Sequence, residues 1–140
     1  MLIGQYEYTI DNKKRLALPA KFRGELGSKV IITKGIEKCL VIYTEEEWKK
    51  ISEKLSNLPM GQLEARSFVR ITLASAMEVL IDKLGRILVP DYLKKYADLK
   101  KNVVICGLSN RLEIWDVEKW ETYRKAVEKK VVDIASKLGV

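Results

Sequence analysis

The chain has 140 residues, enough for one ordinary domain or for two small units that share a core. Hydrophobic residues make up 47% of it and charged residues 32%, which is typical of a soluble globular protein, and no apolar run approaches the roughly 18 residues of a membrane span. The net charge is +7, and histidine is absent. Without histidine the commonest general base and most zinc sites are missing, so we expect no catalytic residues, no metal site and no cofactor.

Two further features bear on the compartment. Residues 1–8 lack the basic segment and apolar core of a secretory signal, so we expect a cytoplasmic protein that does not associate with membranes. Cys39 and Cys106 lie in apolar, strand-like runs and have no CxxC partner. This setting predicts two buried small hydrophobic residues rather than a redox or metal pair.

A ten-residue segment occurs twice. Residues 10–19 are IDNKKRLALP and residues 81–90 are IDKLGRILVP, so that Asp11, Arg15 and Pro19 correspond to residues 71 positions later. Downstream, Leu40 corresponds to Leu112 and Trp48 to Trp120, at a spacing of 72. The excess of basic residues lies mainly in the two repeat segments. The duplication predicts a pseudo-twofold arrangement of two related units and favours a symmetric binding protein over an enzyme.

Taken in chain order, each copy predicts a strand, a charged turn, a short strand ended by proline, a short helix, two strands joined by a glycine-containing turn, and a longer helix. Longer helices are predicted from the capping residue Thr44 to Pro59, over 61–74, and over 117–138. We therefore expect an α+β protein with a mostly β core. Its first unit with the following helix covers 1–58, a connecting helix 59–75, and the second unit with a C-terminal helix 76–140.

The doubled Asp-x-x-x-Arg element allows two interpretations. Asp and Arg could pair across the hairpin, where an exposed ion pair contributes only about 0–1 kcal/mol, and Asp also favours turn entry. Alternatively, two basic loops fixed by a pseudo-twofold core could bind DNA, since a duplex groove admits a two-stranded ribbon and arginine can bind guanine bidentately. The residues presented would be Lys13, Lys14, Arg15, Lys83 and Arg86.

The doubled element, with a proline four residues after each arginine, resembles the MraZ family of bacterial transcriptional regulators. The most specific segment is Arg66-x-x-x-Arg70, then Ala76-Met77-Glu78 and the run from Asp82 to Pro90. The resemblance implies two AbrB-like swapped-hairpin β-barrel units per chain with peripheral helices, and rings of several subunits.

The same resemblance implies a nucleoid-associated protein that binds short direct repeats in promoter DNA and controls its own operon and genes of cell division and wall synthesis. Arg15 and Arg86 would be the principal contacts with double-stranded DNA, and Lys13, Lys14 and Lys83 would lie beside them. The motif's structural residues would be Asp11, Asp82, Gly85, Pro19 and Pro90.

One position departs from the family pattern. Gly85 precedes the second arginine, but Lys14 precedes the first, and lysine tolerates a positive φ poorly. Either the first turn has a different backbone, or Lys14 accepts strain and adds a charge at the DNA surface; we expect related loops with different turns. The competing function is an AbrB-like protein-interaction module, an antitoxin or assembly scaffold. Arg66 and Arg70 could extend the DNA face, but we expect them to pair with carboxylates such as Glu64 or Glu78 at contacts between units or subunits.

Overall fold

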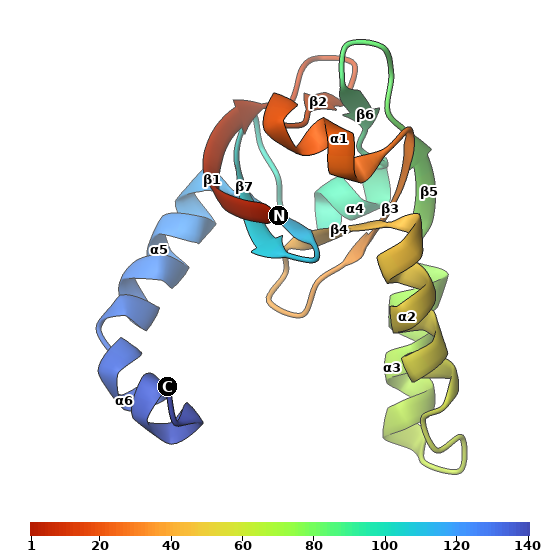
Figure 1. Ribbon diagram of the computed structural model, residues 1–140, viewed down its shortest axis with the longest axis vertical. Coiled ribbons are helices and arrows are strands. Elements are labelled where there is room, and N and C mark those ends of the chain that lie inside the picture. Colours follow the sequence, from red (N-terminus) through yellow and green to blue (C-terminus); the bar gives the residue numbers. More distant parts are fainter.

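A computed structural model describes all 140 residues, and it consists of a β core from which two helical arms project (Figure 1). The strands are β1 (Leu2–Thr9), β2 (Arg15–Ala17), β3 (Lys29–Lys34), β4 (Leu40–Thr44), β5 (Met77–Leu80), β6 (Arg86–Leu88), β7 (Asn102–Ser109) and β8 (Leu112–Asp116). The helices are the 3-10 helix η1 (Ala20–Phe22), α1 (Arg23–Leu26), α2 (Glu45–Ser56), α3 (Leu63–Ala74), α4 (Asp91–Tyr96), α5 (Val117–Glu128) and α6 (Val131–Leu138). The prediction of an α+β protein with a mostly β core is confirmed.

The main sheet has six antiparallel strands in the order β1-β7-β8-β4-β3-β5, and β2 pairs with β6 in a separate two-stranded ribbon. Each repeat contributes the same elements, so the order is symmetric about the β8–β4 pair. The first strand of each repeat pairs with the third strand of the other: β1 lies on β7, and β5 lies on β3. Neither repeat could therefore complete its sheet alone.

The two repeats also share one hydrophobic core of 20 buried residues. Leu16 of β2 and Ile87 of β6 are register partners and are 0% and 1% exposed. Each is followed by a second buried residue, Leu18 or Val89, just before the proline. Full burial of an aliphatic side chain contributes about 1.5–3 kcal/mol, so these few positions hold the short ribbon against the main sheet.

Both cysteines are buried, as the sequence predicts. Cys39 and Cys106 belong to a small apolar cluster with Trp115 and Val104, apart from the main core. Burial disfavours the thiolate and raises the pKa of each thiol to about 12. Both thiols thus stay protonated at neutral pH and serve as small packing groups.

The helix that follows β4 has the capping residue that the sequence predicts. The Thr44 side chain accepts a hydrogen bond from the Glu47 N–H at 3.1 Å, and three glutamates occupy the first turn, where the helix dipole favours negative charge. With α3 this helix forms one arm (Figure 1). None of the helices in the chain combines the length and the apolar character needed to cross a membrane.

One expectation about the helices is wrong. The C-terminal helix is not continuous over 117–138: α5 ends at Glu128, and Lys130 donates its N–H to the Val127 carbonyl in a tighter turn before α6. This arm leaves the core, so its continuity depends on intrinsic propensity, and the adjacent β-branched Val131 and Val132 weaken it. Within the chain, neither Arg66 nor Arg70 forms an ion pair: Arg66 donates to the Met60 carbonyl, and Glu78 pairs with Lys29. Pairing of these arginines across a subunit contact stays a prediction.

We expect Leu16→Ala to lower the free energy of unfolding by about 2–5 kcal/mol, because the ribbon would lose its most buried side chain and a cavity would remain. Leu88→Ala, in the same ribbon but on a residue 60% exposed, should change it by less than about 0.5 kcal/mol. Urea unfolding at one fixed protein concentration measures both. Equal losses for the two variants would contradict the assignment of the inner face.

Candidate nucleic-acid interface

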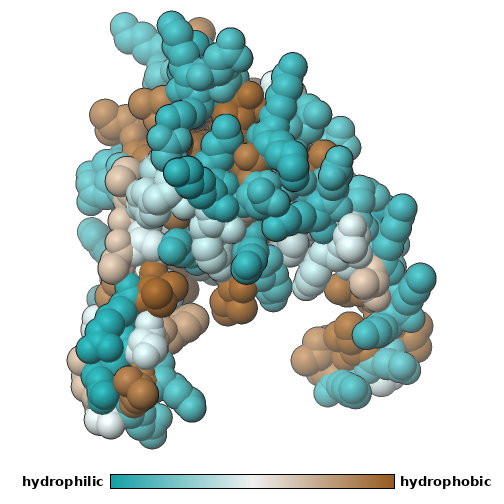
Figure 2. All heavy atoms as spheres, turned by 180° about the vertical axis from the view of Figure 1, so that it is seen from behind, coloured by the Kyte–Doolittle hydropathy of each residue, from teal (hydrophilic) through white to brown (hydrophobic).

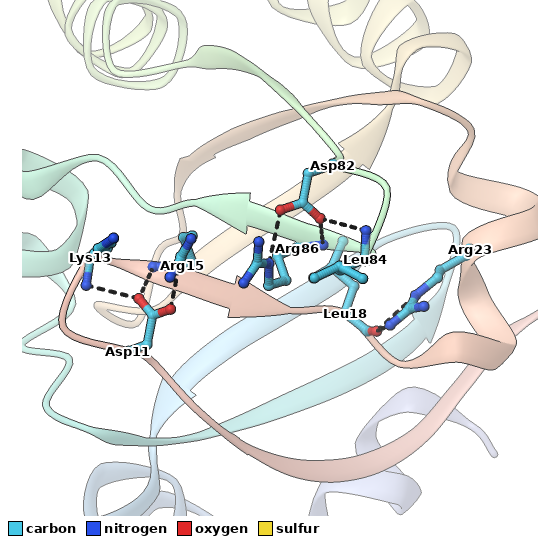
Figure 3. Close-up of polar contacts among 8 residues, drawn as sticks. All are labelled: Asp11, Lys13, Arg15, Leu18, Arg23, Asp82, Leu84 and Arg86. Carbon is cyan, nitrogen blue, oxygen red and sulfur yellow. Dashed lines mark hydrogen bonds and ion pairs between the residues drawn. The ribbon is translucent and has the colours of Figure 1, made fainter.

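The first charged loop is organised by one carboxylate. Oδ1 of Asp11 accepts the backbone N–H groups of Lys13 and Arg15, both at 2.9 Å, and Oδ2 accepts Nε of Arg15 at 2.8 Å (Figure 3). The Asp11 carbonyl accepts the Lys14 N–H at 3.0 Å and closes the turn. A single side chain thus fixes both the backbone of the loop and the direction of its arginine.

The second loop repeats this arrangement bond for bond. Asp82 Oδ1 accepts the N–H groups of Leu84 at 3.0 Å and Arg86 at 2.8 Å, and Oδ2 accepts Nε of Arg86 at 2.8 Å (Figure 3). The Asp82 carbonyl accepts the Gly85 N–H at 2.9 Å. The Asp–Arg ion pair, one of the two interpretations open from the sequence, is therefore present in both loops.

The ion pair does not exclude the second interpretation. In both loops the carboxylate engages Nε of the arginine, and no protein group accepts a hydrogen bond from the terminal nitrogens of Arg15 or Arg86. These nitrogens form the fork that recognises guanine or phosphate bidentately. The aspartates orient the two guanidinium groups and leave their binding ends free.

Ribbon pairing brings the two arginines to one face. β2 and β6 are antiparallel, with Arg15 opposite Leu88 and Ala17 opposite Arg86. Side chains alternate along a strand, so these four residues point away from the core while Leu16 and its partner point into it. The Arg15 and Arg86 side chains, 71 positions apart in the sequence, thus lie side by side on the outward face of the ribbon (Figure 3).

The expectation of different turns is wrong. Lys14 has φ 62° and Gly85 has φ 78°, so both loops adopt the same left-handed turn, set by hydrogen bonds that do not depend on the residue there. Lys14 accepts the strained conformation, as the second alternative proposed. Its Nζ lies 2.6 Å from Oδ2 of Asp91, a partner that sequence reasoning missed because the pair spans 77 positions.

The remaining predicted residues flank the loops. Lys13 and Lys83 are exposed at the loop tips, without carboxylate partners. Pro19 and Pro90 end the ribbon strands in extended conformation, and each caps the N-terminus of the following short helix, η1 or α4. The structure therefore brings all the predicted residues to one end of the molecule, opposite to the helical arms (Figure 1).

A groove of about 800 Å³ runs beside the ribbon, and sequence reasoning did not find it. Its walls include the exposed apolar side chains of Met77, Leu80 and Leu88 next to Arg15 and Arg86. The signals in the sequence are that Leu80 and Leu88 stand where the first repeat has Thr9 and Ala17. The outward surface therefore combines cationic and apolar contacts.

Together, the fold and the site define a class: a duplicated β-hairpin protein that holds two matched basic loops on one shared core. Comparison with known proteins agrees. Two segments, residues 1–71 and 72–137, match the model of the family described as "MraZ protein, putative antitoxin-like".

Full-length relatives carry the same name. A "Transcriptional regulator MraZ" from Caldanaerobacter subterraneus subsp. tengcongensis is 49% identical over 138 residues, covering 99% of this chain and 96% of the relative. The protein of that name from Clostridium tetani is 45% identical over 142 residues, covering 100% of both. The chain belongs to the MraZ family, and these relatives are named as transcriptional regulators, not as enzymes.

Replacing both loop carboxylates tests their structural role. The N–H of Arg15 lowers the pKa of Asp11, and the N–H of Arg86 lowers the pKa of Asp82. A lowered folded-state pKa gives stability that is complete above the usual value of 3.8 and is lost as the pH falls through the folded-state value. We expect the Asp11→Asn, Asp82→Asn double variant to melt below the parent at neutral pH, and the gap to shrink under acid conditions.

Thermal unfolding followed by circular dichroism at about pH 7, 4 and 2.5 measures this gap. Glu7→Gln, which removes the charge of an exposed β1 carboxylate that forms no ion pair, is the control and should match the parent throughout. A gap that stays constant across the whole range would show that the charge of the carboxylates does not hold the loops.

Proposed function

We propose that this chain is a sequence-specific DNA-binding transcriptional regulator that acts on short promoter repeats, including those of its own operon and of division and cell-wall genes. One observation carries the proposal: Arg15 and Arg86 are fixed side by side with their terminal nitrogens free. Membership of a family whose relatives are named transcriptional regulators supports it. The protein would then act on the nucleoid in the cytoplasm.

The chemistry of the loops suits duplex DNA. A two-stranded ribbon fits the major groove, where an arginine can donate to O6 and N7 of guanine. Exposed Lys13 and Lys83 would neutralise phosphates on either side, with Lys14 contributing from the first turn. In this proposal residues 1–58 and 76–140 form two AbrB-like swapped-hairpin units joined by 59–75, an arrangement that the exchange of β1 and β5 between repeats supports.

Assembly into a ring of several subunits is the second part of the proposal. Both arms expose apolar side chains (Figure 2), which on α3 and α6 include Leu63, Phe68, Ile71, Val131, Ile134 and Leu138. The arms project from different sides of the core, so an arm of one copy could pack against the other arm of the next, in a head-to-tail contact that closes into a ring. Several loop pairs on one ring would multiply weak contacts by on the order of 10²–10⁴.

The competing function is a protein-interaction module whose basic loops bind an acidic protein partner, and the family description includes the word antitoxin-like. The two functions make opposite predictions for DNA. A module whose loops bind only an acidic protein would have no affinity for the promoter duplex, and the following experiment separates the two.

We expect the Arg15→Ala, Arg86→Ala double variant to lose binding to the duplex upstream of its own gene, because both recognition forks are removed. Fluorescence anisotropy measures this, and for the parent log affinity should fall with log salt by about 0.9 per phosphate neutralised. Arg124→Ala is the matched control, since that arginine is held by Glu121 and Glu128 on α5, and it should bind as the parent does. Unchanged binding by the double variant would contradict the proposal.

Assembly has its own test. We expect Ile134→Glu to reduce the assembled fraction in sedimentation velocity, because it places a charge within the apolar stripe of α6. Ser136→Glu, which adds the same single charge on the opposite, polar side of the helix, is the matched control and should leave the assembly intact. Equal sedimentation of the two variants would show that this face of α6 is not part of the interface.

A further inference from the structure

Each loop is tied to the other repeat through its turn residue. The Leu18 N–H donates to the Gly85 carbonyl at 2.9 Å, and the Val89 N–H donates to the Lys14 carbonyl at 2.9 Å. Leu18 and Val89 come directly before the prolines, so the short helix after each proline begins beside the loop of the opposite repeat. At this point the symmetry of the two loops ends, because the charged side chain beside each turn residue differs: Arg23 lies beside Gly85, and Asp91 lies beside Lys14.

The second loop receives a cation. The Arg23 guanidinium lies so close to Gly85 that a Cβ on that glycine would sit 2.1 Å from its Cζ. Nε and Nη2 of Arg23 donate to the Leu18 carbonyl at 3.3 and 3.1 Å (Figure 3). No carboxylate pairs with Arg23, so its charge is uncompensated, and Nη1 remains free to donate to a ligand at the loop.

The first loop receives an anion. Asp91 is the first residue of α4, and its Oδ2 lies 2.6 Å from Nζ of Lys14. The corresponding residue of the first repeat is Ala20, which brings no carboxylate to the second loop. Within the first loop itself, Lys13 is therefore the one unpaired lysine. Lys94, which corresponds to Arg23, lies on α4 near Asp91 and makes no hydrogen bond to the first loop, whereas in the second loop Lys83 is joined by Arg23.

We propose that the two loops hold DNA unequally: Arg23 is a further phosphate contact of the second loop, and Asp91 restrains Lys14 and weakens the first loop. This inference rests on the proposed function, and it gives the pseudo-symmetric chain a polarity on the duplex. A protein with two equal loops would match a palindromic site, because site symmetry mirrors protein symmetry. Unequal loops distinguish the two directions along the DNA.

The test is the salt dependence of binding, measured by anisotropy with two labelled duplexes of equal length, one from the region upstream of the gene and one of random sequence. For both duplexes we expect Arg23→Met to lower the log–log salt slope by about 0.9 and to weaken binding about eightfold in 0.1 M salt, the effect of one lost phosphate contact. Arg23→Lys keeps the charge and should keep most of the slope.

Asp91→Ala should do the opposite. It copies the residue found at position 20, frees Lys14, and should raise the slope by about 0.9 and tighten binding by a similar factor. Ala20→Asp is the matched reverse variant, which brings a carboxylate to the second loop and should weaken binding. A purely structural role for Asp91 predicts weaker or unchanged binding in Asp91→Ala, and thermal unfolding of every variant shows whether the fold is intact.

The outcomes separate this inference from the function beneath it. Suppose that the parent binds DNA and the Arg15→Ala, Arg86→Ala double variant does not, but that the Arg23 and Asp91 variants keep the parental salt slope. The loops are then equal, so the inference is wrong while the proposed function stands. The inference is also wrong, with the function intact, if Arg23→Met weakens binding at an unchanged slope and Arg23→Lys fails to restore it. If the parent binds neither duplex, both the function and the inference fail.

Discussion

The pairing of β2 with β6 joins two segments that lie far apart in the chain, and the interface depends on it. A two-stranded ribbon of three residues per strand would be marginal on its own in water. Here Leu16 and Ile87 anchor it in the shared core, and its turns are bonded crosswise to the opposite repeat. The same pairing places Arg15 and Arg86 on one outward face. Loss of the ribbon would therefore remove the site as well as part of the core.

Asp11 and Asp82, in the loops before the ribbon strands, orient the two arginines without using the arginine atoms that could contact DNA. Each carboxylate accepts three hydrogen bonds: two from backbone N–H groups, which fix the turn, and one from Nε of the arginine. None of these bonds occupies the terminal nitrogens of the arginine. A guanidinium that is already oriented loses less side-chain entropy when it binds than a free one does. The ion pair and the proposed DNA contact are therefore compatible, because the first uses Nε of the arginine and the second would use its terminal nitrogens.

Much of this could be predicted from the sequence because the information is local. The period-two alternation gives the strands, Thr44 gives a helix start, and the repeat gives the matched loops. The exchange of strands between repeats does not follow from the residue pattern, because identical periodicity fits pairing within a repeat or between repeats; only the family resemblance implies swapped hairpins. The break after Glu128 was also hidden, since the apolar stripe continues in phase through it. In the loops, the sequence predicts the Asp–Arg pairs. The Lys14–Asp91 ion pair could not be predicted because it crosses the repeats, and the left-handed turn at Lys14 follows from hydrogen bonds to Asp11 that outweigh the preference of lysine for a negative φ.

In the proposed function, DNA recognition and assembly would occupy opposite ends of the molecule. The basic loops lie beyond the ribbon, and the apolar arms project from the other end of the core (Figures 1 and 2). Copies could therefore associate through their arms without covering the loops, and each added copy would bring another loop pair toward the same duplex. This division explains how a small ribbon with few contacts could still bind one site tightly.

The central claim is that both loops of one chain face DNA. Site-specific photo-crosslinking tests it most directly, with a benzophenone side chain placed at Lys13, at Lys83 or, as a control on the arm, at Lys137. We expect crosslinks to the upstream duplex from both loop positions and none from the arm. Crosslinks from the arm alone, or from neither loop, would contradict the claim.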